Sequence, residues 1–364
     1  MEFDKRQTNI AKGIALCMLL WHHLFYNVPE QYKLFTSLYI TANSIPVESF
    51  IADFCKICVS IFLFLSGYGL YKSWTSYKHE HSVNGNLKLG KQFVFVRNHL
   101  LKLMGEYWFI FIIFVPIGFF LGKFSYIPSW HTIVYYTVDF FGLANLFQTS
   151  TFNPTWWFMS TIIVYYLIFP LLMKLNDYSP EILLAISIFL ALIPFIYHFP
   201  FYIRDILQYL LSFISGIYFA NYNLLRRTNA HLNTYPKKII IPLLFFVSFL
   251  IIRLNIINQQ YYLDILGAIP IVLLSYMLIS KIKFLDKILK EIGKVSGKIF
   301  MFHTFINGIY FRDFAYSPKY SILIFLFLLI LYYLIAKVLE FLQNITGYNK
   351  LLHLCLYGKK QKQP

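Results

Sequence analysis

The segment "KGIALCMLLWHHLF" (residues 12–25) decides the class of fold, because it is apolar enough to enter a lipid bilayer although it carries a lysine and two adjacent histidines. The whole chain has this character. Of its 364 residues, 58% are hydrophobic and only 13% are charged, and the mean hydropathy is +0.59. A soluble domain carries about 25% charged residues. The composition therefore predicts an all-α integral membrane protein, a polytopic bundle of transmembrane helices.

Ten segments of the sequence are long and apolar enough to cross a bilayer, since a span needs about 20 mainly apolar residues. They are 10–27, 51–72, 103–122, 155–174, 181–199, 205–222, 239–256, 262–280, 298–313 and 319–341. An eleventh candidate, 130–148, contains His131, Asp139 and Asn145. This polarity favours a helix in the membrane interface, or a re-entrant helix, over a lipid-facing span.

The basic residues indicate the orientation. The net charge is +16, but the lysines and arginines lie in the gaps between apolar segments and form no patch for nucleic acid, so no nucleic-acid partner is expected. With ten spans and a cytoplasmic N-terminus, all but seven of the 32 basic residues fall on the cytoplasmic side. An eleventh span would move several clusters outside, against the positive-inside rule. We therefore expect a multi-pass plasma-membrane protein with both termini in the cytoplasm.

The domain organisation expected from this pattern is a single transmembrane domain, 1–345, followed by a short basic cytoplasmic tail, 346–364. The first apolar segment is read as a retained span, because no small-residue cleavage site follows it closely. Cysteine predicts no metal site: the pair Cys55-x-x-Cys58 lacks the second pair or the histidines that a zinc site needs.

The first span carries the strongest candidate site. Lys12 and His23 are eleven residues apart, which in a helix is roughly 16 Å along the axis and within about 20° of a whole number of turns. They therefore share a face, with His22 turned about 80° away. Histidines in a membrane helix can simply fix packing. Two adjacent ones, with His303 in a later span, favour a site, and a histidine can accept a proton near neutral pH as a general base must.

Three further features have a structural and a functional interpretation. In the second span, Ser66, Gly67 and Gly69 are typical of helix packing, and a nucleophilic Ser66 has no base near it in the sequence.

The basic residues Arg97 and Lys102 at the start of the third span are orientation signals, an anion site for a phosphorylated cofactor, or both. Trp156 and Trp157 open the fourth span at its outer end. They suit the interfacial aromatic belt, and their rings could also stack against a sugar.

In this order, the motifs resemble those of the acyltransferase-3 family of membrane acyltransferases. The similar segments are Lys12-x10-His23, "FLFLSGYG" at 62–69, Arg97 to Leu103, Trp157 with Tyr166 to Pro170, and Ser296 to His303. The resemblance spans residues 5–341. The sequence departs from the family pattern at Lys12, where arginine is usual, near Ile162, where an acid is common, and at Gly105, near a usual proline.

The resemblance implies transfer of an acyl group, commonly acetyl, from cytoplasmic acetyl-CoA to a hydroxyl of a cell-envelope or capsular polysaccharide. The implied general base is His23, assisted by His22 or His303, with an acyl-histidine relay as the alternative. The cations Lys12, Arg97 and Lys102 would hold the CoA phosphates. Trp156, Trp157, Ser66 and Tyr68 would contact the acceptor.

The expected partners are the glycan acceptor, acyl-CoA and the lipid bilayer, and a homodimer is left open. No metal is expected. Two other functions compete: a transporter or flippase of glycan precursors, which also places polar residues at mid-membrane, and a non-enzymatic partner of an envelope assembly complex. Against a transporter, the sequence shows no inverted repeat.

Overall fold

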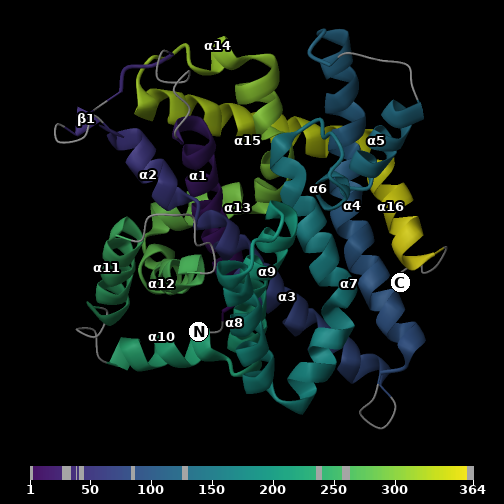
Figure 1. Ribbon diagram of the computed structural model, residues 1–364, viewed down its shortest axis with the longest axis vertical. Helices are drawn as coiled ribbons and strands as arrows, with labels where there is room; N and C mark the ends of the chain where they lie inside the picture. The colour runs from purple at the N-terminus through teal and green to yellow at the C-terminus, as the bar shows by residue number, and fades with distance from the viewer. Residues whose placement is uncertain are drawn as a thin grey trace. The chain divides into compact units, whose positions relative to one another are not determined.

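The computed structural model describes residues 3–26, 34–37, 39–40, 45–82, 87–124, 130–234, 240–255 and 263–358 (Figure 1). Over these ranges the chain is almost entirely helical, which confirms the predicted all-α helical bundle. It forms two compact units. The first comprises Met1–Tyr77, Leu171–Ser296 and Lys319–Phe325, and the second comprises Lys78–Pro170, Gly297–Pro318 and Leu326–Pro364.

The first unit is built mainly from the N-terminal segment and from the middle of the chain. Its elements are α1 (Lys5–Phe25), β1 (Tyr39–Ile40), β2 (Ile45–Pro46), α2 (Val47–Cys55), α3 (Cys58–His81) as far as residue 77, α8 (Pro180–Ile196), α9 (Phe201–Asn221), α10 (Leu224–Thr234), α11 (Ile240–Asn255), α12 (Asp264–Met277), the 3-10 turn η5 (Ile279–Lys281) and α13 (Lys283–Thr304) as far as residue 296. The two short strands pair antiparallel, Tyr39 with Pro46 and Ile40 with Ile45.

Helix α1 begins at Lys5 because the residue before it satisfies its first amides. The Asp4 carboxylate accepts hydrogen bonds from the backbone N–H groups of Arg6 and Gln7, and the Gln7 side chain accepts from the Asp4 N–H. Arg6 also forms an ion pair with Asp286 of α13, at 2.9 Å. The N-terminal end of α1, opposite to the end that carries the histidines, is thus tied to α13.

Two glycines bring α1 and α13 into backbone contact. A methyl group built on Gly13 would lie 2.2 Å from the carbonyl oxygen of Leu289, and one built on Gly293 would lie 1.8 Å from that of Asn9. Only residues without a side chain allow this approach, as in the small-residue interfaces of membrane helices.

A second glycine crossing joins α3 and α9. A methyl group on Gly67 would lie 2.0 Å from the Phe213 carbonyl oxygen, and one on Gly216 would lie 2.0 Å from that of Phe64. About two turns away, the Ser212 hydroxyl donates to the Ser60 hydroxyl across the same pair of helices, at 3.0 Å. The small residues of the second predicted span therefore serve helix packing at Gly67.

Antiparallel helix pairs complete the first unit. Helices α8 and α9 lie side by side, as do α11 and α12 (Figure 1). Ser179 caps α8 by accepting a hydrogen bond from the Ile182 N–H, with Pro180 at the first helical position, where its missing N–H costs nothing. These pairs surround α1 and α3 with apolar helix faces.

The second unit contains α4 (Leu89–Phe120), α5 (Trp130–Phe140), α6 (Ala144–Phe147), the 3-10 turn η2 (Pro154–Trp156), α7 (Trp157–Tyr178) as far as residue 170, α13 from residue 297, the π-helical turn η6 (Phe305–Tyr310), α14 (Arg312–Ala315), α15 (Ser321–Ile345) from residue 326 and α16 (Tyr348–Tyr357). Side chains of α4 and α7 hold the end of α5: Trp108 donates to the Phe140 carbonyl at 3.0 Å, and Ser160 donates to that of Gly142 at 2.8 Å.

The expected cytoplasmic tail contains an ordered helix. α16 lies against α4 (Figure 1), where the Tyr348 hydroxyl donates to the Gly105 carbonyl at 2.7 Å and its ring contacts that of Phe109 at 4.9 Å. A methyl group on Gly105 would meet the Leu352 side chain at 2.7 Å. Gly105, a departure from the family pattern, therefore makes room for α16.

Four of the described helical segments are long and apolar enough to cross a membrane: Val47–His81, Leu89–Phe120, Pro154–Tyr178 and Ser321–Ile345. Three shorter apolar helices, Pro180–Pro194, Ile240–Leu250 and Asp264–Met277, match further predicted spans. The total of ten spans and the cytoplasmic termini stay predictions.

Two helix boundaries differ from the limits of the predicted spans. Within Val47–His81, which contains the predicted span 51–72, α2 ends at Cys55 and α3 begins at Cys58. The predicted span 298–313 starts within α13, which begins at Lys283 and ends at Thr304. The lysine-rich residues between the predicted spans 262–280 and 298–313 are thus helical, and Ile292, Val295 and Ile299 recur at helical spacing and are buried.

Candidate active site

The two histidines of α1 contact each other and α2. The His22 and His23 rings are edge to face with centroids 5.2 Å apart, and the His22 Nδ1 atom lies 2.7 Å from the carbonyl oxygen of Ala52. One residue earlier, the Trp21 indole N–H donates to the Glu48 carbonyl at 3.2 Å. Two consecutive side chains of α1 are thus anchored on the backbone of α2.

The contact with Ala52 has a chemical consequence for His22. A carbonyl oxygen only accepts, so the Nδ1 atom of His22 carries a proton and donates it. In the neutral ring, the basic lone pair then lies on Nε2. His22 and His23 are both half-buried. Lys12, eleven residues before His23 on the same face of the helix, is also half-buried. The predicted shared face therefore lies neither fully in the core nor fully at the surface.

The two residues of the second span that were predicted to contact the acceptor, Ser66 and Tyr68, differ in burial. Ser66 is half-buried. Tyr68 is buried, with its ring edge to face with that of Phe3 at 5.2 Å and the Lys72 ammonium 5.9 Å from its centroid. The surroundings of Tyr68 are those of a packed aromatic residue.

In the second unit, His303 is fully buried. Its Nδ1 atom lies 2.9 Å from the Phe300 carbonyl oxygen, and its Nε2 atom lies 3.1 Å from the Thr304 hydroxyl. The carbonyl fixes the proton on Nδ1, so the hydroxyl donates to Nε2. Its ring also faces the buried ring of Tyr332, at 6.5 Å. Sequence reasoning missed Tyr332, which lies in a long apolar segment that gives no local signal.

Two side chains hold the helix that carries His303. The Trp156 indole N–H donates to the Met301 carbonyl at 2.9 Å, and the Asn153 amide donates to the same oxygen at 3.3 Å. Trp156 is only 2% exposed, while Trp157 is half-buried. Trp156 is therefore a core residue of this unit rather than a member of an exposed aromatic belt, and it positions the segment two residues before His303.

The predicted anion-binding residues of α4 are exposed. The Arg97 guanidinium donates to the neighbouring Asn98 side chain, and the Lys102 ammonium lies 5.9 Å from the ring centroid of Tyr357 in α16. Both cations can reach a ligand from solvent.

A charged cluster of the second unit escaped the sequence analysis. Lys298 forms an ion pair with Glu106 at 2.8 Å and lies 4.0 Å from Glu340, while Gln343 donates to Glu106 at 3.2 Å. The Lys298 side chain is 13% exposed. Charges this buried persist in a membrane protein because they are paired. Lys298 of α13 thus joins its helix to α4 and α15.

Asp139, near the end of α5, is buried and accepts hydrogen bonds from the Phe152 N–H at 2.8 Å and the Thr151 hydroxyl at 3.0 Å. Burial raises the pKa of its carboxyl to about 7, although both hydrogen bonds act to lower it. The carboxylate holds the segment that leads into η2 and therefore supports Trp156 indirectly.

Within the ranges that the structure describes, no group of three or more histidine, cysteine, aspartate or glutamate residues is placed to hold a metal ion.

The long apolar helices of the described chain are those of a helical membrane protein. The chain belongs to the acyltransferase-3 family: the sequence profile described as "Acyltransferase domain" matches residues 7–348. It is therefore a membrane acyltransferase. No curated protein and no solved structure matches the chain.

Proposed function

We propose that this acyltransferase moves an acetyl group from cytoplasmic acetyl-CoA to a hydroxyl of a cell-envelope or capsular polysaccharide, as a multi-pass protein of the plasma membrane. The family supports the transfer of an acyl group. The positive-inside pattern supports a donor that reaches the protein from the cytoplasm.

The paired imidazoles of α1 carry the proposal. His23 is the general base, and His22, whose Nδ1 proton is held by Ala52, is the group beside it. A second basic nitrogen next to the first can receive or return a proton without a large movement. His303 assists from within the second unit, where its ring nitrogens are engaged by Phe300 and Thr304.

The proposed reaction is a direct transfer. The acceptor hydroxyl oxygen attacks the thioester carbonyl carbon while His23 takes the hydroxyl proton, and a tetrahedral intermediate forms. The carbon–sulfur bond then breaks, and the proton passes to the departing CoA sulfur. The products are the acetyl ester and CoA with a free thiol. In the alternative relay, a histidine nitrogen attacks the thioester carbonyl carbon, the carbon–sulfur bond breaks, and CoA leaves with the histidine proton as the free thiol. The acceptor hydroxyl then attacks the acetyl-histidine, and its proton passes to the histidine ring as the ester forms.

The donor's phosphates are the proposed ligands of Lys12, Arg97 and Lys102. On the acceptor side, the half-buried Ser66 and Trp157 are the proposed contacts. The buried Tyr68 and Trp156 enter the proposal as residues that hold these neighbours in place.

Replacement of His23 by alanine tests the assignment. Membranes that contain the variant are supplied with acetyl-CoA labelled in its acetyl group and with purified envelope glycan. General base catalysis contributes about 10²–10⁴-fold, so label transfer should fall by at least about 100-fold. The matched control is His198→Ala, since His198 is exposed in the segment between α8 and α9. Immunoblots verify that both variants are present in equal amounts.

Retention of normal transfer by His23→Ala would remove the base assignment. Suppose that the wild type releases CoA in the absence of an acceptor and that the acetyl label then stays on the protein. If His23→Ala abolishes this labelling of the protein, the relay replaces direct transfer. Solute movement without loss of thioester would point to a transporter instead. Mass spectrometry of the envelope glycans, with and without the gene, identifies the acceptor sugar.

A further inference from the structure

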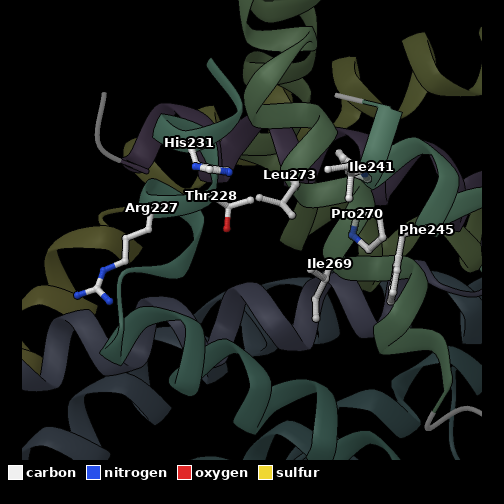
Figure 2. A pocket seen from close by; sticks show the side chains of 9 residues that line it. Arg227, Thr228, His231, Ile241, Phe245, Ile269, Pro270 and Leu273 are labelled. Carbon is white, nitrogen blue, oxygen red and sulfur yellow. The ribbon is translucent and has the colours of Figure 1, made fainter. Parts of the chain in front are cut away.

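A cavity of about 510 Å³ lies among α10, α11 and α12, away from the histidines of α1 and within the first unit (Figure 2). This volume falls in the range of about 300–1,000 Å³ that accommodates small ligands. It is lined by Arg227, Thr228, His231, Ile241, Pro242, Phe245, Ile269, Pro270 and Leu273.

The cavity lies beside the contact between α11 and α12. They touch at Gly267, where a methyl group would lie 2.5 Å from the ring of the buried Phe249. Phe245, one turn before Phe249 on α11, is 53% exposed and lines the cavity. On α12, Pro270 and Leu273, one and nearly two turns after Gly267, form the facing wall. Pro270 donates no backbone hydrogen bond in the interior of α12, which favours a local bend.

The walls of the cavity are apolar and one end is polar. Figure 2 shows Ile241, Pro270 and Phe245 together at one side, and Thr228 with His231 on α10 at the other. Helix α10 is amphipathic: Leu225 and Asn229 are buried while Arg226, Arg227 and His231 are exposed. A short amphipathic helix of this kind lies in the membrane interface, with its charges at the level of the lipid headgroups.

The neighbouring surface indicates what occupies the cavity. The outer face of α11 exposes a stripe of large apolar side chains: Ile240, Ile241, Leu244, Phe245 and Val247 are each 46–57% exposed. Such a face suits hydrocarbon and not water. The cavity thus joins a lipid-facing helix to a cationic one, and the distribution of basic residues assigns α10 to the cytoplasmic side. Basic pockets between helices on that side suit anionic lipid headgroups.

We propose that this cavity is a binding site for an anionic phospholipid, whose phosphate lies at Thr228 and His231 and whose acyl chain lies along α11 and α12. The exposed Arg227 guanidinium, which points away from Thr228 and His231 in Figure 2, turns toward the phosphate when the lipid is bound. The lipid fills the gap between the two helices and fixes α10 against them. The site is independent of the acetyl-transfer reaction.

Native mass spectrometry of the purified, delipidated protein in a neutral detergent tests the proposal. Phosphatidylglycerol is added in one arm and phosphatidylcholine in the other, at equal concentration. One lipid-facing cation contributes about 1 kcal/mol, which is roughly a fivefold change in affinity. We therefore expect Arg227→Gln to reduce phosphatidylglycerol retention by roughly fivefold, with no change for phosphatidylcholine.

The matched control is Arg226→Gln. Arg226 is the exposed neighbour of Arg227 on the same helix and does not line the cavity, so its loss should leave retention unchanged. A second variant, Leu273→Trp, fills the cavity and should reduce retention of phosphatidylglycerol although it leaves the charge of the protein unchanged.

The proposal is overturned if the wild type retains both lipids equally, or if Arg226→Gln has the effect of Arg227→Gln. Displacement of the lipid by excess inorganic phosphate would assign the site to a free anion and also overturn it. Because the readout is lipid mass, failure here leaves the proposed acetyl transfer untouched, and failure of the His23 test leaves this site untouched.

Discussion

Replacement of Gly67 by alanine should destabilise the protein, although the same change at Gly69 should not. A methyl group on Gly67 would lie 2.0 Å from the Phe213 carbonyl oxygen, where ordinary contact begins at 3.4 Å. The obstacle is the backbone of α9, so no side chain can rotate away. At Gly69, on the same helix, nothing lies within 4 Å of the added methyl group.

The two variants differ in free energy by an amount that follows from this geometry. Overpacking costs about 1–3 kcal/mol, and a backbone obstacle places Gly67→Ala near the upper end. Alanine also gains about 1 kcal/mol over glycine in a helix interior. The net cost at Gly67 is therefore about 2 kcal/mol, whereas Gly69→Ala should gain about 1 kcal/mol. The difference between the two variants is about 3 kcal/mol.

Thermal unfolding of both variants in one detergent measures this difference. An unfolding entropy of about 2.1 cal/mol/K per residue over 364 residues converts it to about 4 °C between the two midpoints. Equal midpoints for the two variants, or a wild-type midpoint for Gly67→Ala, would refute the close crossing of α3 and α9.

Two more predictions concern the other glycine contact and the buried carboxyl. Gly293→Ala should lower the unfolding midpoint, because its methyl group would lie 1.8 Å from the Asn9 carbonyl oxygen, while Gly297→Ala on the same helix meets nothing within 4 Å and should not; equal effects in a thermal scan would contradict the contact. The second concerns Asp139, whose pKa is raised to about 7 in the folded state. Between about pH 4 and pH 7 the folded protein therefore keeps a proton on Asp139 that the unfolded protein has lost. The stability of the folded state consequently falls as the pH rises from about 4 to about 7. Asp139→Asn should remove about 2–3 kcal/mol of this decline between pH 5 and pH 7. If the free energy of unfolding changes equally with pH in the wild type and the variant over this range, the raised pKa of Asp139 is excluded.

The sequence predicted what depends on composition and on helical spacing. The helical class, most apolar segments and the shared face of Lys12 and His23 follow from periods that a single helix imposes on its own residues. The first part of α13 was missed for a related reason. Its lysines were counted as charge, while the spacing of Ile292, Val295 and Ile299 already indicated a buried helical face.

What the sequence could not supply are the partners of polar groups across the fold. The oxygen that holds His22 belongs to Ala52, 30 residues away, and the oxygen that holds Trp156 belongs to Met301, 145 residues away. Backbone carbonyls have no sequence signature, because every residue carries one. Trp156 was therefore assigned to an exposed belt by composition, although its indole N–H is satisfied inside the unit.

The hydrogen bonds of the three candidate histidines suggest how their roles divide. A general base must offer a lone pair to a substrate, and so it needs both a fixed tautomer and room beside the ring. His303 has the fixed tautomer, but it is fully buried, with the Thr304 hydroxyl at its Nε2 atom. The rings of His22 and His23 are half-buried, and the Ala52 carbonyl fixes the proton of His22 while the ring of His23 lies beside it. In the proposed reaction, proton transfer is therefore assigned to α1, and His303 has a supporting role on a helix whose Met301 carbonyl accepts from Trp156 and Asn153.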